Sequence, residues 1–299
     1  MPLGLLTGLG AALSWGTLDL LIALATRRVG SLRVTTWMQL IGAVLVAVVV
    51  LVSGTAIPTD PFVLIGGALV GLAGAGAYLS YFTGLRIGPI AVVSGVVAAY
   101  GGLTVVLAVL IRGETLDPLQ AAGAIAATVG VVLTGVSFDR GVRGRFASPG
   151  VAFAIVALIL FASMSIGSDI VIDHAPWLSV LFVSRTSNAI LSVVVLVVAS
   201  TVLRRQAAPL MATDPDADHR ATLRVVGIVA IAAALDVLGL MSFSYGLEHA
   251  ETWLVGLASS FGPAVTIVAA VTLLGERLRA IQWIGLGAIL VGMILIALP

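Results

Sequence analysis

The sequence from Gly113 to Gln120, GETLDPLQ, recurs 162 residues later from Gly275 to Gln282 as GERLRAIQ. The same offset relates further positions of the two stretches: Gly84-Leu85 to Gly246-Leu247, Gly123 to Gly285 and Gly130 to Gly292. The shared G-E-x-L-x(3)-Q pattern is not low in complexity, and one constant offset at several positions indicates an internal repeat. The chain is therefore expected to contain two copies of one structural unit.

The composition points to a lipid environment. Of the 299 residues, 60% are apolar and 10% are charged, and the mean hydropathy is +1.19. Soluble domains carry about 25% charged residues because their surfaces face water. A chain with less than half of that share is expected to face lipid. Ten helices of about 20 residues with short connections fill a chain of this length.

Apolar runs separated by arginine, acidic residues, proline or short polar clusters predict ten membrane-spanning segments. The first five are expected at about 3–25, 34–53, 62–84, 90–111 and 118–138, and the second five at about 150–172, 178–203, 223–246, 252–274 and 280–298. Backbone polar groups in hydrocarbon must be satisfied within the segment, so even the valine-rich run Val44–Val52 is expected to be helical. The predicted fold class is an all-α membrane protein.

The stretch 139–149, DRGVRGRFASP, has the composition of a linker and divides the predicted helices five and five. The expected organisation is a first repeat at 1–138, this linker, and a second repeat at 150–299. A unit of five helices reverses its orientation in the membrane when it is copied, because five is odd. The sequence therefore predicts a 5+5 inverted-topology repeat, an architecture of many secondary transporters.

At these residues the chain resembles the EamA-type, ten-helix family of the drug/metabolite transporter superfamily. The resemblance is carried by Leu274-Gly275-Glu276-Arg277-Leu278, Gln282-Trp283-Ile284-Gly285 and Gly292, by the first-half copy Gly113-Glu114-Thr115-Leu116 with Gln120, and by Trp15-Gly16. It implies a central cavity between two inverted repeats. It also implies export or exchange of amino acids, nucleobases or other small metabolites.

The repeated motif has a structural interpretation. Its members are Gly113, Glu114, Gln120, Gly275, Glu276 and Gln282. Glu114 and Glu276 fall in short turns, where a carboxylate can accept hydrogen bonds from the N-terminus of the next helix. The glycines that follow, namely Gly123, Gly130, Gly285, Gly287 and Gly292, are expected to allow close helix contact. The alternative is a direct part in transport.

The arginines are distributed unevenly between the two sides of the predicted bundle. The odd-numbered connections contain Arg27, Arg28, Arg33, Arg86, Arg140, Arg143, Arg145, Arg204, Arg205, Arg220, Arg224, Arg277 and Arg279, and the even-numbered connections contain Arg112. The positive-inside rule places the odd connections in the cytoplasm and both termini outside. This differs from the cytoplasmic termini usual in the family. The exclusive use of arginine as the basic residue favours a bacterial or archaeal cytoplasmic membrane.

Ionisable groups inside a membrane are costly and are candidates for function. Asp236 lies near the predicted midplane, where it either carries a coupled proton or is a structural aspartate, protonated or ion-paired. Asp169 and Arg185 enter from the same side, and we expect them to pair, as a static clamp or as a gate. Asn188 extends the polar face of Arg185. Asp19 occupies the matching region of the first helix and is a further candidate. The alternative is that its side chain only extends toward the cytoplasmic end of that helix.

Several aromatic and amide side chains are candidates to line a substrate cavity, because each needs a hydrogen-bond partner if it is buried. They are Trp15, Gln39, Tyr78, Tyr81, Tyr100 and Tyr245. Trp15 precedes Asp19 by one helical turn and shares its face. Simple packing is the alternative for most of them.

The sequence also narrows the function. A net charge of +1 and the absence of cysteine argue against nucleic-acid binding and thiolate chemistry. The histidines are too scattered for a metal site, and no cofactor or catalytic constellation is expected. The predicted function is secondary transport of a small polar metabolite, driven by a proton gradient or by a counter-substrate because no P-loop occurs. A channel, a non-transporting scaffold and, less favoured, a membrane enzyme are the alternatives.

Overall fold

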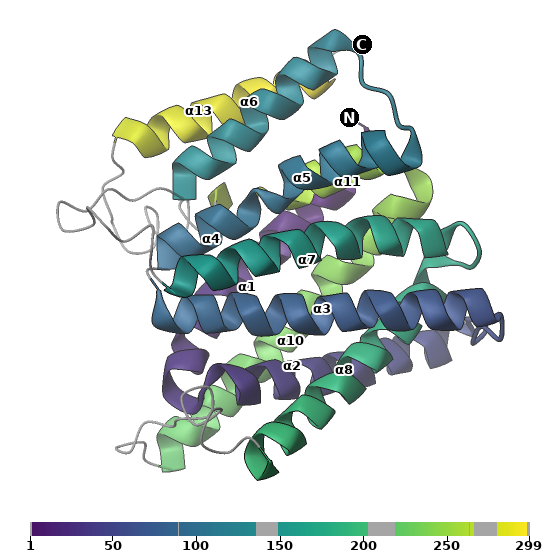
Figure 1. The fold of residues 1–299 in the computed structure, drawn as a ribbon, viewed down its shortest axis with the longest axis vertical. Helices are drawn as coiled ribbons and strands as arrows, with labels where there is room; N and C mark the ends of the chain where they lie inside the picture. The colour runs from purple at the N-terminus through teal and green to yellow at the C-terminus, as the bar shows by residue number, and fades with distance from the viewer. Residues whose placement is uncertain are drawn as a thin grey trace.

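The computed structural model describes residues 2–88, 90–135, 149–202, 219–262, 264–265 and 280–297. Its helices are α1 (Leu3–Val29), α2 (Ser31–Ser53), α3 (Pro61–Ile87), α4 (Ile90–Ala98), α5 (Tyr100–Leu107), the π-helix η1 (Ala108–Arg112), α6 (Pro118–Gly135), α7 (Pro149–Ile172), α8 (Trp177–Thr201), α10 (His219–His249), α11 (Thr252–Ser259) and α13 (Ala280–Ala297). Figure 1 shows them as one bundle of closely packed helices.

Within the described ranges, six helical stretches are long and apolar enough to cross a membrane. They are Ser31–Ser53, Pro61–Ile87, Val93–Arg112, Pro149–Ile172, Trp177–Thr201 and Arg224–His249. A bilayer core of about 30 Å requires about 20 helical residues. The prediction of an all-α membrane protein is confirmed, including the helical state of Val44–Val52 within α2. Of the predicted segment 252–274, residues 263 and 266–274 lie outside the described part of the chain.

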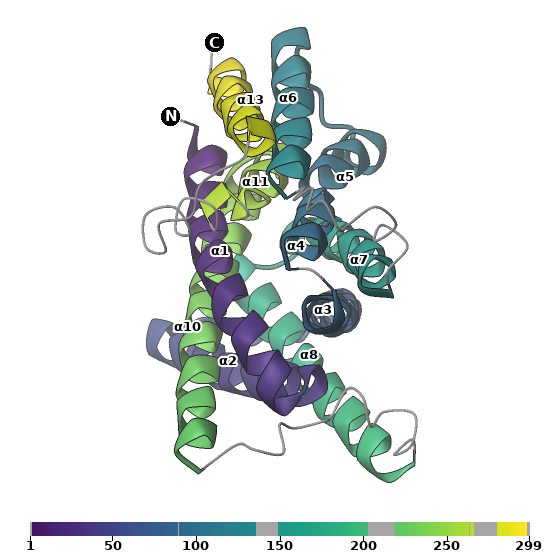
Figure 2. The same ribbon diagram turned by 90° about the vertical axis from the view of Figure 1, so that its left-hand side faces the viewer.

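The helices of the two halves contact one another in matching pairs. α3 packs along α7 while α1 packs along α10, and α3 meets α8 as α10 meets α2. Exchanging the two halves turns the α3–α7 contact into the α10–α1 contact, and the α3–α8 contact into the α10–α2 contact. α2 packs on α8 and α6 on α13, so two pairs of equivalent helices also meet directly, and α5 packs on α11. Figures 1 and 2 show α6 and α13 side by side at one edge of the bundle.

Glycines bring α6 and α13 into close contact. A Cβ on Gly123 would overlap the carbonyl region of Gly292, and a Cβ on Gly130 would overlap that of Gly285. The early glycine of α6 therefore meets the late glycine of α13, so these equivalent helices run antiparallel. This is the relationship that an inverted repeat requires. The predicted packing role fails at Gly287, where a Cβ would meet no atom of the described residues within 4 Å.

The fourth apolar segment is interrupted. α4 ends at Ala98 and α5 begins at Tyr100. Beside this break, a Cβ on Gly101 would overlap the hydroxyl of Ser260, so α5 and the end of α11 approach each other through small residues. The interruption positions Tyr100 next to the second half of the chain.

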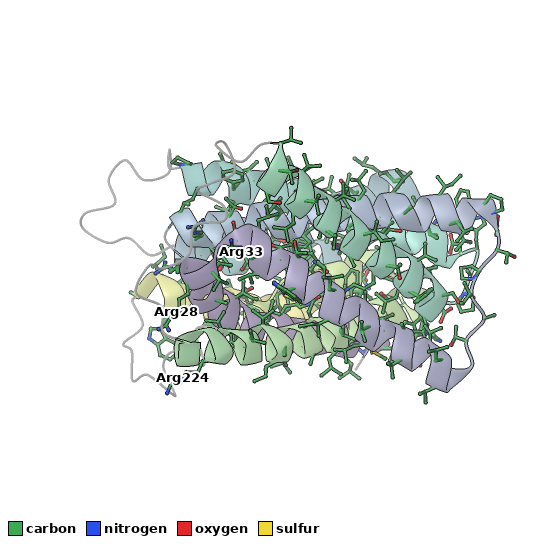
Figure 3. The ribbon with its side chains drawn as sticks, turned by 90° about the horizontal axis from the view of Figure 1, so that it is seen from below. Arg28, Arg33 and Arg224 are labelled. Atoms are coloured by element: carbon green, nitrogen blue, oxygen red, sulfur yellow. The ribbon has the colours of Figure 1, made fainter. Side chains whose placement is uncertain are left out.

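Arginines from separate helices gather at one end of the bundle. Figure 3 shows Arg28, Arg33 and Arg224 at the same end, although they come from three different helices. We call this the arginine end. The turns after α2 and α7 lie at the opposite end, because each helix crosses the bundle once.

Candidate functional site

A buried ion pair lies in the middle of the bundle. Nη1 of Arg185, on α8, lies 2.6 Å from Oδ2 of Asp236, on α10, and the two side chains are 1% and 0% exposed. The hydroxyl of Tyr78, on α3, donates a hydrogen bond of 2.6 Å to the other oxygen of Asp236. Charge pairing with an additional hydrogen bond is what makes buried charges tolerable in an apolar interior. The contacts of Asp236 thus favour the ion-paired alternative.

Helix α2 makes room for the guanidinium of Arg185. The carbonyl of Met38 accepts a hydrogen bond of 3.3 Å from Nη2 of Arg185. One turn later, a Cβ on Gly42 would overlap the guanidinium. A glycine at this position therefore lets α2 pass directly over the charged group.

The predicted pair between Asp169 and Arg185 is wrong. Asp169 instead lies 2.5 Å from Nε of Arg112, and Asp173 lies 2.8 Å from Nη2 of the same arginine. The prediction rests on the end of the bundle from which the two residues enter, which they share, although Asp169 lies three residues from the end of α7 and Arg185 eight residues from the start of α8. Depth does not fix the direction in which a side chain leaves its helix. Asp169 points toward the end of the fourth apolar segment, whereas Arg185 points toward α2 and α10.

Glu114 binds the N-terminus of a helix from the other half. Its two carboxylate oxygens accept hydrogen bonds of 2.8 Å from the backbone N–H of Thr252 and 2.9 Å from that of Trp253. These are free donors of the first turn of α11. The predicted capping role is confirmed in kind, but the helix is not the next one along the chain. Residues Arg112 to Glu114 therefore connect the first half to α7 and α11.

The next helix, α6, has its own cap. Asp117 Oδ1 accepts from the backbone N–H of Gln120 at 2.8 Å, and Gln120 Oε1 accepts from that of Asp117 at 3.1 Å. This reciprocal arrangement is a capping box. Gly113 precedes it with a φ of 70°, a left-handed conformation suited to glycine. Gly275 and Glu276 lie outside the described residues, as does the side chain of Gln282.

A cavity lies between α1, α3, α4, α5, α7, α10 and the end of α11. It encloses about 640 Å³ of empty space, its open mouth included. Its lining residues are Trp15, Leu18, Asp19, Tyr78, Tyr81, Ser94, Val97, Ala98, Tyr100, Phe161, Met164, Ser165, Phe243, Ser259, Ser260 and Gly262. We call it the aromatic cavity. Five of the predicted site residues meet here.

Asp19 is the acidic side chain among the described residues that line the aromatic cavity. It is 8% exposed and accepts a hydrogen bond from the hydroxyl of Tyr81. The described residues that line the cavity with it include no arginine and no histidine. Asp19 therefore differs from Asp236, whose charge is balanced by an adjacent guanidinium.

A second cavity lies nearer the opposite end of the bundle and has a volume of about 410 Å³, its open mouth included. Its polar lining includes Arg185, Asn188, Ser168, Ser184 and Ser244. The prediction that Asn188 extends the polar face of Arg185 is in agreement with this lining. We call it the arginine cavity. Tyr78 and Met164 line both cavities, so these two side chains form the partition between them.

Two of the predicted residues lie elsewhere. Tyr245 stacks on His249 with ring centroids 4.2 Å apart and contacts Trp177 at the end of the bundle, outside both cavities. Gln39 is 0% exposed, and its amide atoms have no hydrogen-bond partner in the described part of the chain. It lines neither cavity.

Sequence reasoning missed the contribution of α7. Phe161, Met164, Ser165 and Ser168 line one or both cavities. Their spacing of three or four residues is that of a single helix face. The two serines and the methionine that share one face of this apolar helix are the signal that could have identified them.

Paired halves, membrane-length apolar helices and a buried polar centre define a two-repeat helical membrane protein. The chain belongs to the EamA-like transporter family, whose sequence model matches residues 2–136 and 148–298. The family resemblance inferred from the repeated motif is thereby confirmed. A solved crystal structure of a protein superposes with a TM-score of 0.75 at 21% identity, over 98% of this chain and 96% of the other, which shows a shared fold. No curated protein matches the chain.

Proposed function

We propose that this protein is a secondary transporter that moves small polar metabolites across a membrane by alternating access. The observation that carries the proposal is the pair of cavities that share Tyr78 and Met164 as a partition. A transporter needs a central site that opens to one side at a time, and such sites lie near the midplane between repeats. Membership of a transporter family supports the same function. The proposed substrates are amino acids, nucleobases or related compounds.

The two cavities lie at different depths. Ser94 of the aromatic cavity is four residues from the start of α4, or about 6 Å from the arginine end at 1.5 Å per residue. Ser168 of the arginine cavity is four residues from the end of α7, or about 6 Å from the opposite end. We propose that each cavity is the remnant of an access path to its own side. Rocking of the two repeats would open one path while closing the other.

We propose that the arginine end faces the cytoplasm. Arginine-rich connections are retained on that side of the membrane. Both termini would then be extracytoplasmic, and the aromatic cavity would be the one nearer the cytoplasm. A bacterial or archaeal cytoplasmic membrane is the proposed location, with export or exchange as the mode of transport.

We propose that Asp19 is the coupling carboxylate. A carboxylate that gains and loses a proton during transport must be reachable from an aqueous path, and Asp19 lines a cavity. Asp236 is enclosed by Arg185 and Tyr78, so it better suits a fixed role in holding α3, α8 and α10 together. Exchange against a counter-substrate is the alternative source of energy.

Flux measured in proteoliposomes tests this function. Labelled amino acids, nucleobases and small amines are supplied outside, with and without an imposed pH gradient. Saturable, protein-dependent uptake is expected for at least one class. Flux that rises linearly with concentration would indicate a channel, and the absence of flux for every class would favour a scaffold. Chemical conversion of a compound would favour an enzyme.

A further inference from the structure

We propose that the aromatic cavity binds organic cations, namely an ammonium group carried on a small apolar or aromatic body, and disfavours compounds with a free carboxylate. This inference rests on the proposed function, because it names the substrate class of the same site. Three features of the cavity support it: its acidic side chain, its aromatic side chains, and the hydrogen-bond donors and acceptors that it offers to a ligand.

The ionisable group of the cavity is acidic. Asp19 provides a carboxyl group that carries a negative charge when it is ionised, and the described lining residues provide no basic side chain. The nearby guanidinium of Arg185 lines the other cavity and is held by Asp236 and by the carbonyl of Met38. A cationic ligand would therefore gain a partner in the aromatic cavity, whereas an anionic ligand would meet a like charge.

Aromatic rings surround the same space. Phe161 lies 5.3 Å from Tyr78, 6.3 Å from Tyr81 and 5.9 Å from Tyr100, measured between ring centroids. Trp15, on α1, lines the cavity from another side. A cation within about 6 Å of a ring face is attracted to the π-electrons, and cages of several rings are a common way to bind ammonium groups. The rings also favour an apolar or aromatic ligand body.

Three serine hydroxyls of the cavity already donate hydrogen bonds to backbone carbonyls. Ser165 donates to the carbonyl of Phe161 at 2.9 Å, Ser259 to that of Gly256 at 2.9 Å, and Ser260 to that of Leu257 at 2.7 Å. Each hydroxyl has one hydrogen and two lone pairs. Toward a ligand, these serines therefore act as acceptors.

The tyrosine hydroxyls are committed in the same way. Tyr78 donates to Asp236, and Tyr81 bonds to Asp19. Tyr100 lies 2.7 Å from Ser259 and must be the donor there, because the hydrogen of Ser259 is already used. By the same reasoning Ser94, 3.1 Å from Tyr81, donates to it.

The described side chains of the cavity thus offer acceptors almost exclusively. An ammonium group supplies N–H donors and a positive charge, so it matches this inventory, while a carboxylate needs donors that these side chains lack. The exception is the indole N–H of Trp15, which has no acceptor in the described part of the chain. It would suit a hydroxyl or carbonyl oxygen on the ligand body.

Calorimetric titration of the purified full-length protein tests the inference. The probes share one skeleton: phenethylamine is a cation, phenylalanine is a zwitterion and 3-phenylpropanoate is an anion at neutral pH. Phenethylamine is expected to bind at least about tenfold more tightly than either of the others. Benzyltrimethylammonium is expected to bind as well, because cation–π attraction does not require an N–H group. Equal or tighter binding of phenylalanine or 3-phenylpropanoate would overturn the inference, as would the absence of saturable binding by both cations.

Matched variants assign the effect to the cavity. Asp19→Asn is expected to abolish the preference for phenethylamine. Asp60→Asn is the control, because Asp60 caps α3 outside the cavity and asparagine caps equally well. A preference that persists in folded Asp19→Asn would overturn the inference. The probe series on the unmodified protein decides the matter if Asp19→Asn does not fold.

Binding and flux separate the two proposals. Selective cation binding without any flux would leave the inference standing and reject transport. Saturable flux of amino acids or anions that does not depend on Asp19 would support transport and reject the inference.

Discussion

Arg185 and Asp236 form their ion pair within the second repeat, and the first repeat has no equivalent of Asp236. The 162-residue offset that relates Gly84 to Gly246 places Gly74 at the position of Asp236. Gly74 contributes space instead of charge, since a Cβ there would overlap the amide of Asn188. The two halves are thus alike in backbone and different at their centre. We infer that the asymmetric ion pair ties α8 to α10, while the first repeat supplies Tyr78.

Removing one charge of this pair should destabilise the protein. Asp236→Asn leaves Arg185 buried without its counter-charge, and such a loss costs about 3–5 kcal/mol. The midpoint of thermal unfolding in detergent should fall well below that of the control Asp60→Asn. The double variant Arg185→Met with Asp236→Leu should recover part of the loss, because it leaves no buried charge. Equal midpoints for Asp236→Asn and the control would contradict the structural role.

Because α2 passes close to the ion pair, adding one methyl group at Gly42 is expected to lower the stability of the protein. Gly42→Ala places a Cβ against the guanidinium of Arg185 and should cost about 1–3 kcal/mol through overpacking. Gly287→Ala is the matched control, since no atom of the described residues lies within 4 Å of a Cβ there. Thermal unfolding compares the two. Equal stability of the two variants would contradict the close contact between Gly42 and Arg185.

The contact between Glu114 and α11 predicts a second stability effect. Glu114→Ala removes the acceptor of two backbone N–H groups, and loss of a cap costs about 0.5–2 kcal/mol. The repeat offset maps Thr252 onto Ile90, so we expect Glu276 to serve the start of α4 in the same way. Thermal unfolding of Glu114→Ala and Glu276→Ala should therefore give similar losses. A loss in Glu114→Ala alone would show that the cap is confined to the first copy of the motif.

The orientation of the protein is open to a direct test, because the chain contains no cysteine. Thr55→Cys lies in the turn after α2, and Ala147→Cys lies in the linker between the repeats. An impermeant thiol reagent added to intact cells should label Thr55→Cys and leave Ala147→Cys unlabelled until the cells are broken. Labelling of Ala147→Cys from outside would reverse the proposed orientation.

Helix positions and the repeat could be predicted because they depend on local composition and on a constant spacing. The predicted segment 150–172 corresponds to α7 at Pro149–Ile172, and the predicted start at 118 is the start of α6. Segments that face lipid must be long apolar helices, so they can be recognised from the sequence without any knowledge of tertiary contacts.

The polar contacts could be predicted only in part, because they depend on how helices rotate about their own axes. The sequence identifies both Asp236 and Arg185 as buried charges, yet entry from the same side of the membrane alone pairs Arg185 with Asp169. A shift of one residue turns a side chain by about 100° around the helix. Arg112 is the arginine of the predicted even-numbered connections, and this is the available signal for its pairing with Asp169.

Alternating access is tested most directly by cysteines placed in the two cavities. Ser94→Cys in the aromatic cavity and Ser168→Cys in the arginine cavity change one atom each in a cysteine-free chain. Rates of labelling by a small thiol reagent are measured in proteoliposomes with and without a transported substrate. The account predicts that substrate changes the two rates in opposite directions. Rates that rise or fall together, or labelling of both cysteines from one side, would contradict it.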